Sequence, residues 1–280
     1  MALVLLWLVC ALPAAGAVPG VPSVDHIIVV VFENKNPARL LGSPHAPTFT
    51  AYAKRHAKIT RYYGVTHPSL PNYLALVSGS THGIKGNCTG CVISARTLAD
   101  TIEASGRTWK TYAEGLPRAG WLGAVSGRYA KKHNPFVYFR NIAASPARRA
   151  HVVPFTYLTR DLQADRLPHF SLIVPDMCNS MHDCSLAVGD AWLRKLVPKL
   201  VKLPNTAIFI LFDEGTTGER GGGHIPAIAL GMAVKQGVRF TRVTDHYGAL
   251  RTIEEAWGLP LLGGSAQALP ITGIWRESAG

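Results

Sequence analysis

Short, continuous apolar runs alternate along the chain with segments in which apolar residues recur every three or four positions. The runs at 26–32 and 206–212 consist almost entirely of β-branched, aliphatic and aromatic residues, and the run at 169–174 is similar. Continuous runs of this kind are typical of strands that a parallel sheet buries on both faces. Further strand-like runs at 108–112 and 225–231 extend the series.

Helical periodicity fills the spaces between these runs. The segments that carry it are 47–57, 71–78, 96–105, 155–164, 186–203 and 246–257. This alternation predicts an α/β fold, a three-layer α/β/α sandwich with a mostly parallel central sheet. The segment 114–150 is rich in glycine, proline, arginine and histidine, and predicts a long loop or excursion.

Residues 1–17, MALVLLWLVCALPAAGA, contain no charge, a leucine-rich core and a small-residue end. This pattern predicts a secretory signal cleaved after Ala17. A permanent anchor is the alternative, although the apolar run is short for a membrane span. We expect residues 18–280 to form a single domain without a transmembrane segment, secreted or held in the cell envelope. With 48% hydrophobic residues, that length suffices for one large core.

Four cysteines follow the predicted signal, in two close pairs: Cys88 with Cys91, and Cys178 with Cys184. An even number in an exported protein favours two local disulfides. A four-thiolate zinc site is the alternative, but only the spacing of the first pair suits it. Such short rings gain little chain entropy, so we expect the bridges to shape loops rather than to hold the fold together.

The chain is basic, with 29 lysines and arginines against 17 acidic residues and a net charge of +12. The excess clusters in KRHAKITR, RYAKKHN, PARRAH and RKLVPKLVK. A positive field attracts anionic substrates or surfaces; a basic face that only aids solubility is the alternative. The sequence contains no nucleic-acid-binding motif, so we expect no nucleic-acid partner.

Polar residues gather where the predicted strands end. They are Glu33 and Asn34; Asp176, Asn179, His182 and Asp183; Asp213 and Glu214; and His224, which precedes the run at 225–231. Active sites of parallel α/β sheets lie beyond the carboxyl ends of the strands. A single carboxylate there is commonly a cap or turn residue, but four such groups favour one convergent site.

The stretch THPSLPNYLALVSG, residues 66–79, holds Ser69 between two prolines just before a predicted helix. Pro71 suits the first turn of that helix. Free N–H groups and the dipole at a helix N-terminus favour an anion, so Ser69 is placed to attack a phosphorus or carbonyl centre. An N-cap serine is the alternative.

Oxygen donors dominate the predicted site. Glu33, Asn34, Asp213 and Glu214, with Ser69 as an alkoxide, suit one divalent cation such as Mg²⁺, Ca²⁺ or Mn²⁺, and zinc is not excluded. A cation would lower the pKa of the serine and make it a nucleophile. A second group, Asp176, His182 and His224, suits either a second metal or general-acid and hydrogen-bonding roles toward a phosphoryl group. A structural role is the alternative for each histidine.

The sequence resembles the phosphoesterase family of secreted acid phosphatases and bacterial phospholipase C enzymes, within the alkaline-phosphatase-like superfamily. The matching motifs include VVVFENKN, THPSLPNYLALVSGSTHGIKGNC, YAKKHNPFVYF, PDMCNSMHDCS, FDEG, GGGHIPAIALG and HYGALRTIEEAWGLP. Their order and spacing are most similar to the bacterial secreted acid phosphatase branch, which includes phosphatidylinositol 3-phosphate phosphatases.

The resemblance implies roles for individual residues. Ser69 becomes the nucleophile, and the metal ligands become Glu33, Asn34, Asp213 and Glu214. Asn87, in HGIKGN, becomes a ligand of a phosphoryl oxygen. His133, His182 and His246 fall in motifs of the branch, and we expect His133 and His246, together with Asp176, to bind the substrate. Glu33 and Glu214 depart from the two-metal pattern of the superfamily, which favours a single metal with a second site as the alternative.

Together these expectations describe residues 18–280 as one catalytic domain, a secreted metal-dependent phosphomonoesterase of the acid phosphatase type. It would work through a phosphoseryl intermediate on Ser69, with a histidine, either His182 or His224, protonating the leaving alcohol. Its partners would be small phosphorylated substrates or phosphoinositide head groups. The alternative is a phosphodiesterase or phospholipase C, and a third possibility is a binding protein without turnover, which would be expected to lack Ser69 or Asp213.

Overall fold

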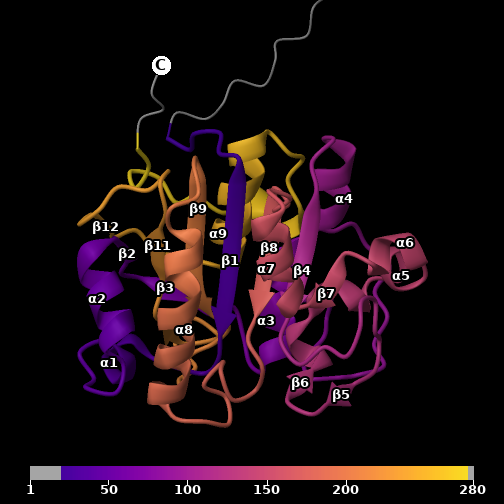
Figure 1. The fold of residues 1–280 in the computed structure, drawn as a ribbon, viewed down its shortest axis with the longest axis horizontal. Coiled ribbons are helices and arrows are strands. Elements are labelled where there is room, and N and C mark those ends of the chain that lie inside the picture. The colour runs from indigo at the N-terminus through magenta and orange to yellow at the C-terminus, as the bar shows by residue number, and fades with distance from the viewer. Residues whose placement is uncertain (1–19, 277–280) are drawn as a thin grey trace, which may run out of the picture.

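An eight-stranded sheet crosses the molecule in the computed structural model, which describes residues 20–276 (Figure 1). The predicted leader, residues 1–17, lies outside the described residues. In spatial order the strands are β12 (Arg239–Phe240), β2 (Ala57–Ile59), β11 (Ile228–Leu230), β9 (Thr206–Phe212), β1 (His26–Phe32), β8 (Phe170–Val174), β4 (Trp109–Ala113) and β7 (Val152–Pro154).

The centre of the sheet is parallel, as the apolar runs predict. Strand β1 lies between β8 and β9, with Val29 opposite Leu172 on one side and Phe209 on the other. Five neighbouring strands, β9, β1, β8, β4 and β7, run in the same direction. The run at 225–231 is not the one strand that its pattern predicts: Ile225 belongs to a separate small sheet, and only residues 228–230 form β11, which is antiparallel to β9 and β2.

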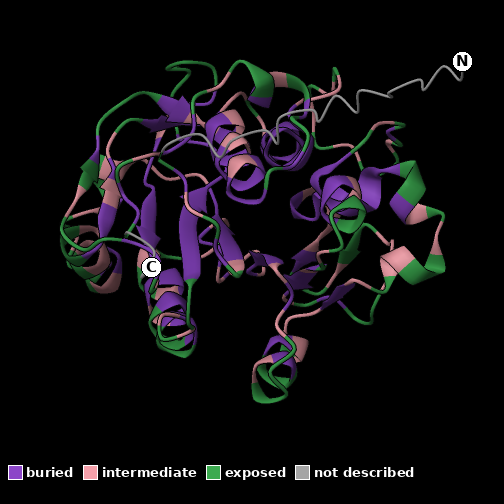
Figure 2. Cartoon of the chain, turned by 90° about the horizontal axis from the view of Figure 1, so that it is seen from above, coloured by how far each residue is buried: buried purple, intermediate pink, exposed green. Residues whose placement is uncertain are grey.

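Helices cover both faces of the sheet, which confirms the three-layer α/β/α prediction (Figures 1 and 2). One face carries α2 (Pro47–Arg55), α7 (Thr156–Gln163) and α8 (Leu186–Leu200), and the other carries α3 (Ser69–Ser78), α4 (Leu98–Ala104) and α9 (His246–Trp257). The inner sides of α2, α4, α7 and α8 are buried and their outer sides are exposed (Figure 2), as expected for amphipathic helices. Helix α3 is instead buried along its whole length, and α9 has no exposed residue. Among residues 20–276, no helix has the length and apolar character required to cross a membrane.

Aromatic side chains fill the space between the sheet and the α2–α8 layer. Phe32, at the end of β1, meets Phe49 edge to face with 5.0 Å between ring centroids, and Trp192 at 5.7 Å. Phe212 of the neighbouring strand lies 5.5 Å from Phe32. Such pairs add about 0.5–1.5 kcal/mol each beyond the area they bury, so they fix the carboxyl ends of β1 and β9, where the polar residues follow.

The segment 114–150 is not the open loop that its composition predicts. Short elements occupy it: strands β5 (Val125–Ser126) and β6 (Tyr129–Ala130), two 3₁₀ turns (Lys131–His133 and Pro135–Tyr138), and helices α5 (Arg140–Ala143) and α6 (Pro146–Arg149). Phe136 is buried and packs on Trp109 of β4, with ring centroids 4.6 Å apart. The aromatic residues of the segment 114–150 recur without a regular period, so the sequence pattern does not reveal that they enter the core.

Both predicted disulfides are present, Cys88–Cys91 and Cys178–Cys184. The thiolate zinc alternative is therefore wrong. Cys88–Cys91 closes a small ring in the loop between α3 and α4, and Cys178–Cys184 closes one between β8 and α8. Both positions agree with a role in shaping loops. A separate three-stranded sheet, β10 (His224–Ile225), β3 (Tyr62–Tyr63) and β13 (Thr244–Asp245), stands beside the main one.

Two helix-ending glycines offer a test of how tightly this fold is packed. Gly79 ends α3 with φ of 70°, and Gly258 ends α9 with φ of 62°. A methyl group at Gly79 would overlap the Leu262 carbonyl, whereas one at Gly258 would meet no atom within 4 Å. We expect Gly258→Ala to lose about 1–2 kcal/mol of unfolding free energy from the left-handed backbone alone. Gly79→Ala should lose clearly more in urea titrations; equal losses would contradict this packing.

Candidate active site

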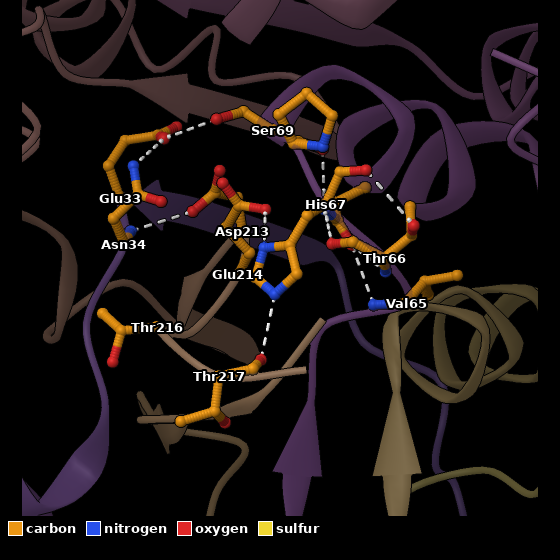
Figure 3. Close-up of polar contacts among 12 residues, drawn as sticks. Glu33, Asn34, Val65, Thr66, His67, Ser69, Asp213, Glu214, Thr216 and Thr217 are labelled. Carbon is orange, nitrogen blue, oxygen red and sulfur yellow. Dashed lines mark hydrogen bonds and ion pairs between the residues drawn. The ribbon is translucent and has the colours of Figure 1, made fainter. Parts of the chain in front are cut away.

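Glu33 and Asp213 meet at the carboxyl edge of the sheet because their strands, β1 and β9, are parallel neighbours (Figure 3). The backbone N–H of Asp213 donates to the Phe32 carbonyl at 2.9 Å, and that of Asn34 donates to Asp213 Oδ1 at 3.0 Å. Both carboxylates are fully buried. The structure thus brings together Glu33, Asn34 and Asp213, three members of the predicted ligand set.

Ser69 faces this pair from the first turn of α3 (Figure 3). Its hydroxyl donates to Glu33 Oε2 at 3.1 Å. The N-cap position belongs to Pro68, and no side chain caps the helix, so the N-cap reading of Ser69 is wrong. One residue later, the free N–H of Leu70 donates to the side-chain oxygen of Asn87 at 3.0 Å, which places Asn87 at the same helix end.

Three further side chains surround Glu33. The Tyr73 hydroxyl donates to Oε1 at 2.6 Å, and the Asn34 amide donates to Oε2 at 3.3 Å. His133 Nε2 lies 3.1 Å from Oε1 without the alignment of a hydrogen bond. Burial, and after it the negative charge of Asp213, raise the pKa of Glu33 well above its usual value.

A cation fits this acidic pocket on the chemistry of its donors. Asp213 Oδ2 is buried without a hydrogen-bond partner, and an unpartnered carboxylate oxygen beside a second buried carboxylate is strongly unfavourable unless positive charge compensates it. Among residues 20–276, no three histidine, cysteine, aspartate or glutamate side chains already converge as a metal centre. Oxygens of Asn34 and Ser69 would therefore complete the set around Glu33 and Asp213.

Glu214 points elsewhere. Its carboxylate pairs with His67 Nδ1, and His67 Nε2 donates to the Thr217 carbonyl at 2.9 Å (Figure 3). Burial and the nearby Asp213 raise the pKa of Glu214 to about 7. Burial alone would lower the pKa of His67, but the hydrogen bonds to Thr217 and Glu214 raise it overall. His67 is absent from the predicted site, although it lies inside the THPSLPN motif.

His246 lies beneath the acidic pair rather than in the open part of the site. Its Nε2 donates to the backbone carbonyl of Asp213 at 2.6 Å, and its Nδ1 accepts from the Tyr62 hydroxyl at 3.1 Å. Burial lowers the pKa of His246, which favours the neutral ring that these contacts require. The histidine therefore braces the turn that carries Asp213.

The disulfide loop 178–184 brings a second polar group to the site. His182 Nε2 lies 3.0 Å from Lys132 Nζ, and Nδ1 lies 2.6 Å from an Asp183 oxygen. An imidazole beside an ammonium group accepts through Nε2 and so carries its proton on Nδ1. The His182 ring lies 5.9 Å from that of His133, which stacks on Tyr73.

Two predicted residues have other contacts. Asp176 Oδ1 accepts from the N–H groups of Cys178 and Asn179, so it shapes the start of the disulfide loop. His224 Nε2 donates to the Thr60 carbonyl at 2.9 Å, and its ring stacks on Tyr63 in the small sheet. None of the contacts described for residues 20–276 joins the His224 side chain to Glu33 or Asp213.

Asn72 fixes the path of the chain into Ser69. Its Oδ1 accepts from the N–H groups of Val65 and Thr66 at 2.8 and 3.1 Å. Its amide donates to the carbonyls of Thr66 and Pro68 at 2.7 and 3.2 Å. The sequence shows Asn72 only as part of the THPSLPN motif. The four hydrogen bonds explain why an asparagine side chain is needed at this position.

Comparison with known proteins places this fold and site in context. The model of the Phosphoesterase family matches residues 43–260. A phosphatidylinositol-3-phosphatase of Mycobacterium tuberculosis is 34% identical over 272 residues, covering 95% of this chain and 88% of that protein. An acid phosphatase of Aspergillus fumigatus is 31% identical over 220 residues, 73% of this chain but only 49% of its own length.

Solved structures agree on the fold. A protein of the alkaline phosphatase superfamily from Vibrio parahaemolyticus superposes with a TM-score of 0.60 at 15% identity, covering 89% of this chain and 72% of that one. The fold is therefore that of the alkaline phosphatase superfamily, with an acidic pocket opposite a helix-borne serine. The chain belongs to the Phosphoesterase family and is a phosphoric ester hydrolase, which confirms the resemblance inferred from its motifs.

The Asn72 contacts generate a prediction. Asn72→Ala removes four hydrogen bonds and leaves buried backbone groups of the Ser69 loop unpaired, so it should lose about 2–4 kcal/mol of stability. Phosphatase activity of the folded fraction should fall at least ~10-fold, because small misplacements of reacting groups are costly. Thermal unfolding and chromogenic ester assays measure both. The control is Asn141→Ala, whose exposed amide contacts only Asp100; a similarly mild effect at Asn72 would contradict this role.

Proposed function

We propose that this phosphoric ester hydrolase is a metal-dependent phosphomonoesterase of the acid phosphatase type that works through a phosphoseryl intermediate on Ser69. The observation that carries the proposal is the position of the Ser69 hydroxyl. It lies at the N-terminus of α3 and donates to buried Glu33, which adjoins the unpartnered oxygen of Asp213.

The residues that would hold a divalent cation are Glu33, Asn34, Ser69 and Asp213, with Glu214 joining them if it exchanges its contact with His67. A bound cation would supply Lewis acidity toward the phosphoryl group and favour the alkoxide of the serine. One site follows from this set, because His224 and Asp176, which would be needed for a second, make other contacts.

The side chains of this protein supply the remaining steps. The Ser69 hydroxyl directs its proton at Glu33, which leaves the oxygen lone pairs to attack phosphorus. The new serine–phosphorus bond forms as the ester bond to the alcohol breaks, and water then hydrolyses the phosphoserine. The amide of Asn87 and the N-terminus of α3 would receive the phosphoryl oxygens.

Lys132, which contacts His182, brings positive charge close to Glu33. We assign Lys132 to the phosphoryl oxygens and His182 to the leaving alcohol, with Asp183 orienting the ring and His133 lying against Glu33. Because Nε2 of His182 faces the lysine ammonium, the proton for the alcohol would come from this Lys132–His182 pair rather than from an isolated imidazole.

The names of the relatives support phosphomonoesters as substrates, since one is a phosphatidylinositol-3-phosphatase and others are acid phosphatases. We therefore favour monoesters, including phosphoinositide head groups, over the phosphodiesterase alternative. The two disulfides and the charge-free, apolar start of the chain support export to an oxidising compartment.

Ser69→Ala should abolish turnover, by about 10³-fold or more, while the fold is kept, because it removes the nucleophile and little volume. Acid quenching of the wild-type protein with substrate should trap phosphate on the peptide that contains Ser69, detected by mass spectrometry. The matched control is Ser78→Ala at the other end of the same helix. A folded Ser69→Ala protein with wild-type rates would sink the covalent mechanism.

Asp213→Asn should lower divalent metal content and activity together, because it removes one negative charge from the acidic pocket. Elemental analysis of purified protein and assays with added Mg²⁺, Ca²⁺, Mn²⁺ or Zn²⁺ measure the two effects, and excess cation should partly restore the rate. The control is Asp165→Asn, because Asp165 is exposed and precedes β8, near the amino ends of the parallel strands. Full activity in wild-type protein that elemental analysis finds metal-free would refute the metal assignment.

A further inference from the structure

A cavity of about 550 Å³ opens next to the candidate active site. Lys35, Arg39 and His45 line one wall, on the chain between β1 and α2, and Cys184 and Ser185 line the other, at the start of α8. We call this cavity the Arg39 pocket. Among the residues that line it, only Asn34 has a role in the proposed function.

Asn34 links the Arg39 pocket to the serine. It lines the pocket, and its amide donates to Glu33 Oε2, the same atom that accepts the hydrogen bond from the Ser69 hydroxyl. The opposite wall begins at Cys184, two residues after His182 in the disulfide loop. A phosphate ester held at Ser69 would therefore have the Arg39 pocket within reach of its alcohol part.

The size of the pocket indicates that it receives more than the phosphoryl group. Ligand pockets for small molecules typically enclose about 300–1,000 Å³, and this cavity falls in that range. The groups that we assign to the phosphoryl oxygens, Asn87 and Lys132, do not line it. The space is thus available to the leaving alcohol.

The charge of the pocket selects the chemistry of that alcohol. All three ionisable side chains that line it are basic, and no carboxylate lines it. Lys35 Nζ donates to two backbone carbonyls, Glu33 O at 3.4 Å and Met181 O at 2.8 Å. Arg39 is exposed, and among the described residues its guanidinium has no carboxylate partner within ion-pair distance.

We propose that the Arg39 pocket binds a second anionic group on the substrate, so that the preferred substrates are phosphomonoesters whose alcohol carries another phosphate. Arg39 supplies the planar, bidentate fork that suits a phosphate, and Lys35 and His45 add donors from the same wall. This proposal rests on the proposed function. The same chemistry is offered by a soluble bisphosphate and by the phosphodiester of a phosphoinositide lipid.

The general positive charge of the protein makes a different prediction. A net charge of +12 attracts every anion from a distance, so losing any one surface arginine would weaken all anionic substrates slightly. A built subsite instead makes the loss specific to Arg39 and to substrates with the second phosphate. Arg166, exposed in the turn before β8 at the opposite edge of the sheet, provides the matched control.

The experiment compares Arg39→Gln and Arg166→Gln with the wild type on three substrates: inositol 3-phosphate, inositol 1,3-bisphosphate, and phosphatidylinositol 3-phosphate in neutral vesicles. We expect Arg39→Gln to lower kcat/KM for the second-phosphate substrates about 10- to 100-fold, mainly through KM, as for a lost charged hydrogen bond. Inositol 3-phosphate should change less than about 2-fold, and Arg166→Gln should change nothing comparable.

The two arms separate the sources of the second phosphate. A loss with inositol 1,3-bisphosphate alone assigns soluble bisphosphates, a loss with the vesicles alone assigns the lipid head group, and a loss with both assigns the shared chemistry. Equal losses on all three substrates, or the same losses in Arg166→Gln, overturn the pocket and leave the proposed function standing.

A binding measurement keeps the proposal testable without turnover. In the Ser69→Ala background, calorimetry should show inositol 1,3-bisphosphate binding at least ~10-fold more tightly than inositol 3-phosphate, and Arg39→Gln should erase that difference. An unchanged difference in the Arg39→Gln protein overturns the proposal. If the wild type hydrolyses none of the three esters or a chromogenic monoester, it is the proposed function that fails, and the binding result still decides the pocket.

Discussion

The confinement of two carboxylates, Glu33 and Asp213, at the ends of adjacent parallel strands is the constraint on which the site depends. Burying one carboxylate is expensive, and burying two side by side is more so. The fold offsets part of this by directing donors at Glu33 from Ser69, Tyr73 and Asn34. Asp213 Oδ2 is left without such a donor, so a positive charge beside this oxygen would lower the cost of burying the pair.

The rest of the molecule holds this unfavourable pair in place. The aromatic cluster around Phe32 packs the end of β1 against β9. His246 donates to the backbone carbonyl of Asp213 and accepts from the Tyr62 hydroxyl, which fixes the backbone at Asp213. Glu33 is also anchored through its own N–H, which donates to the Ser180 carbonyl in the disulfide loop. The two buried carboxylates, whose proximity is unfavourable, are thus carried by deeply buried strands, which are the parts of a fold that open locally least often.

Much of this arrangement follows from the sequence because it depends on local patterns. The strand at 206–212 and the helix at 246–257 have the predicted bounds; Asp245 caps that helix and Gly258 ends it. Glu33 and Asp213 could be paired in advance, since parallel strands end at a common edge. The segment 114–150 could not be predicted, because its buried aromatic residues pack on partners remote in sequence.

The site residues divide in the same way. His224 begins a strand of the small sheet, so its nearness to a predicted strand end did not bring its side chain to the carboxylates. Tyr73 lies four residues after Ser69 and so on the same side of α3, but the apolar pattern of that helix does not show that its hydroxyl donates to Glu33. Lys132 was counted only as part of a basic run. Its contact with His182 joins segments 50 positions apart, which no local pattern records.

The loop closed by the Cys178–Cys184 disulfide contacts both the candidate active site and the Arg39 pocket. Within it, His182 contacts Lys132, Cys184 lines the Arg39 pocket, and the Ser180 carbonyl accepts from the Glu33 N–H. Cleavage of that one covalent bond by thiols would loosen the His182–Lys132 contact, the wall of the Arg39 pocket and the anchor of Glu33 together, while the hydrogen bonds of the sheet would remain. These contacts of the loop therefore depend on surroundings that keep the disulfide oxidised, and reductants such as those of the cytosol would weaken them without unfolding the sheet.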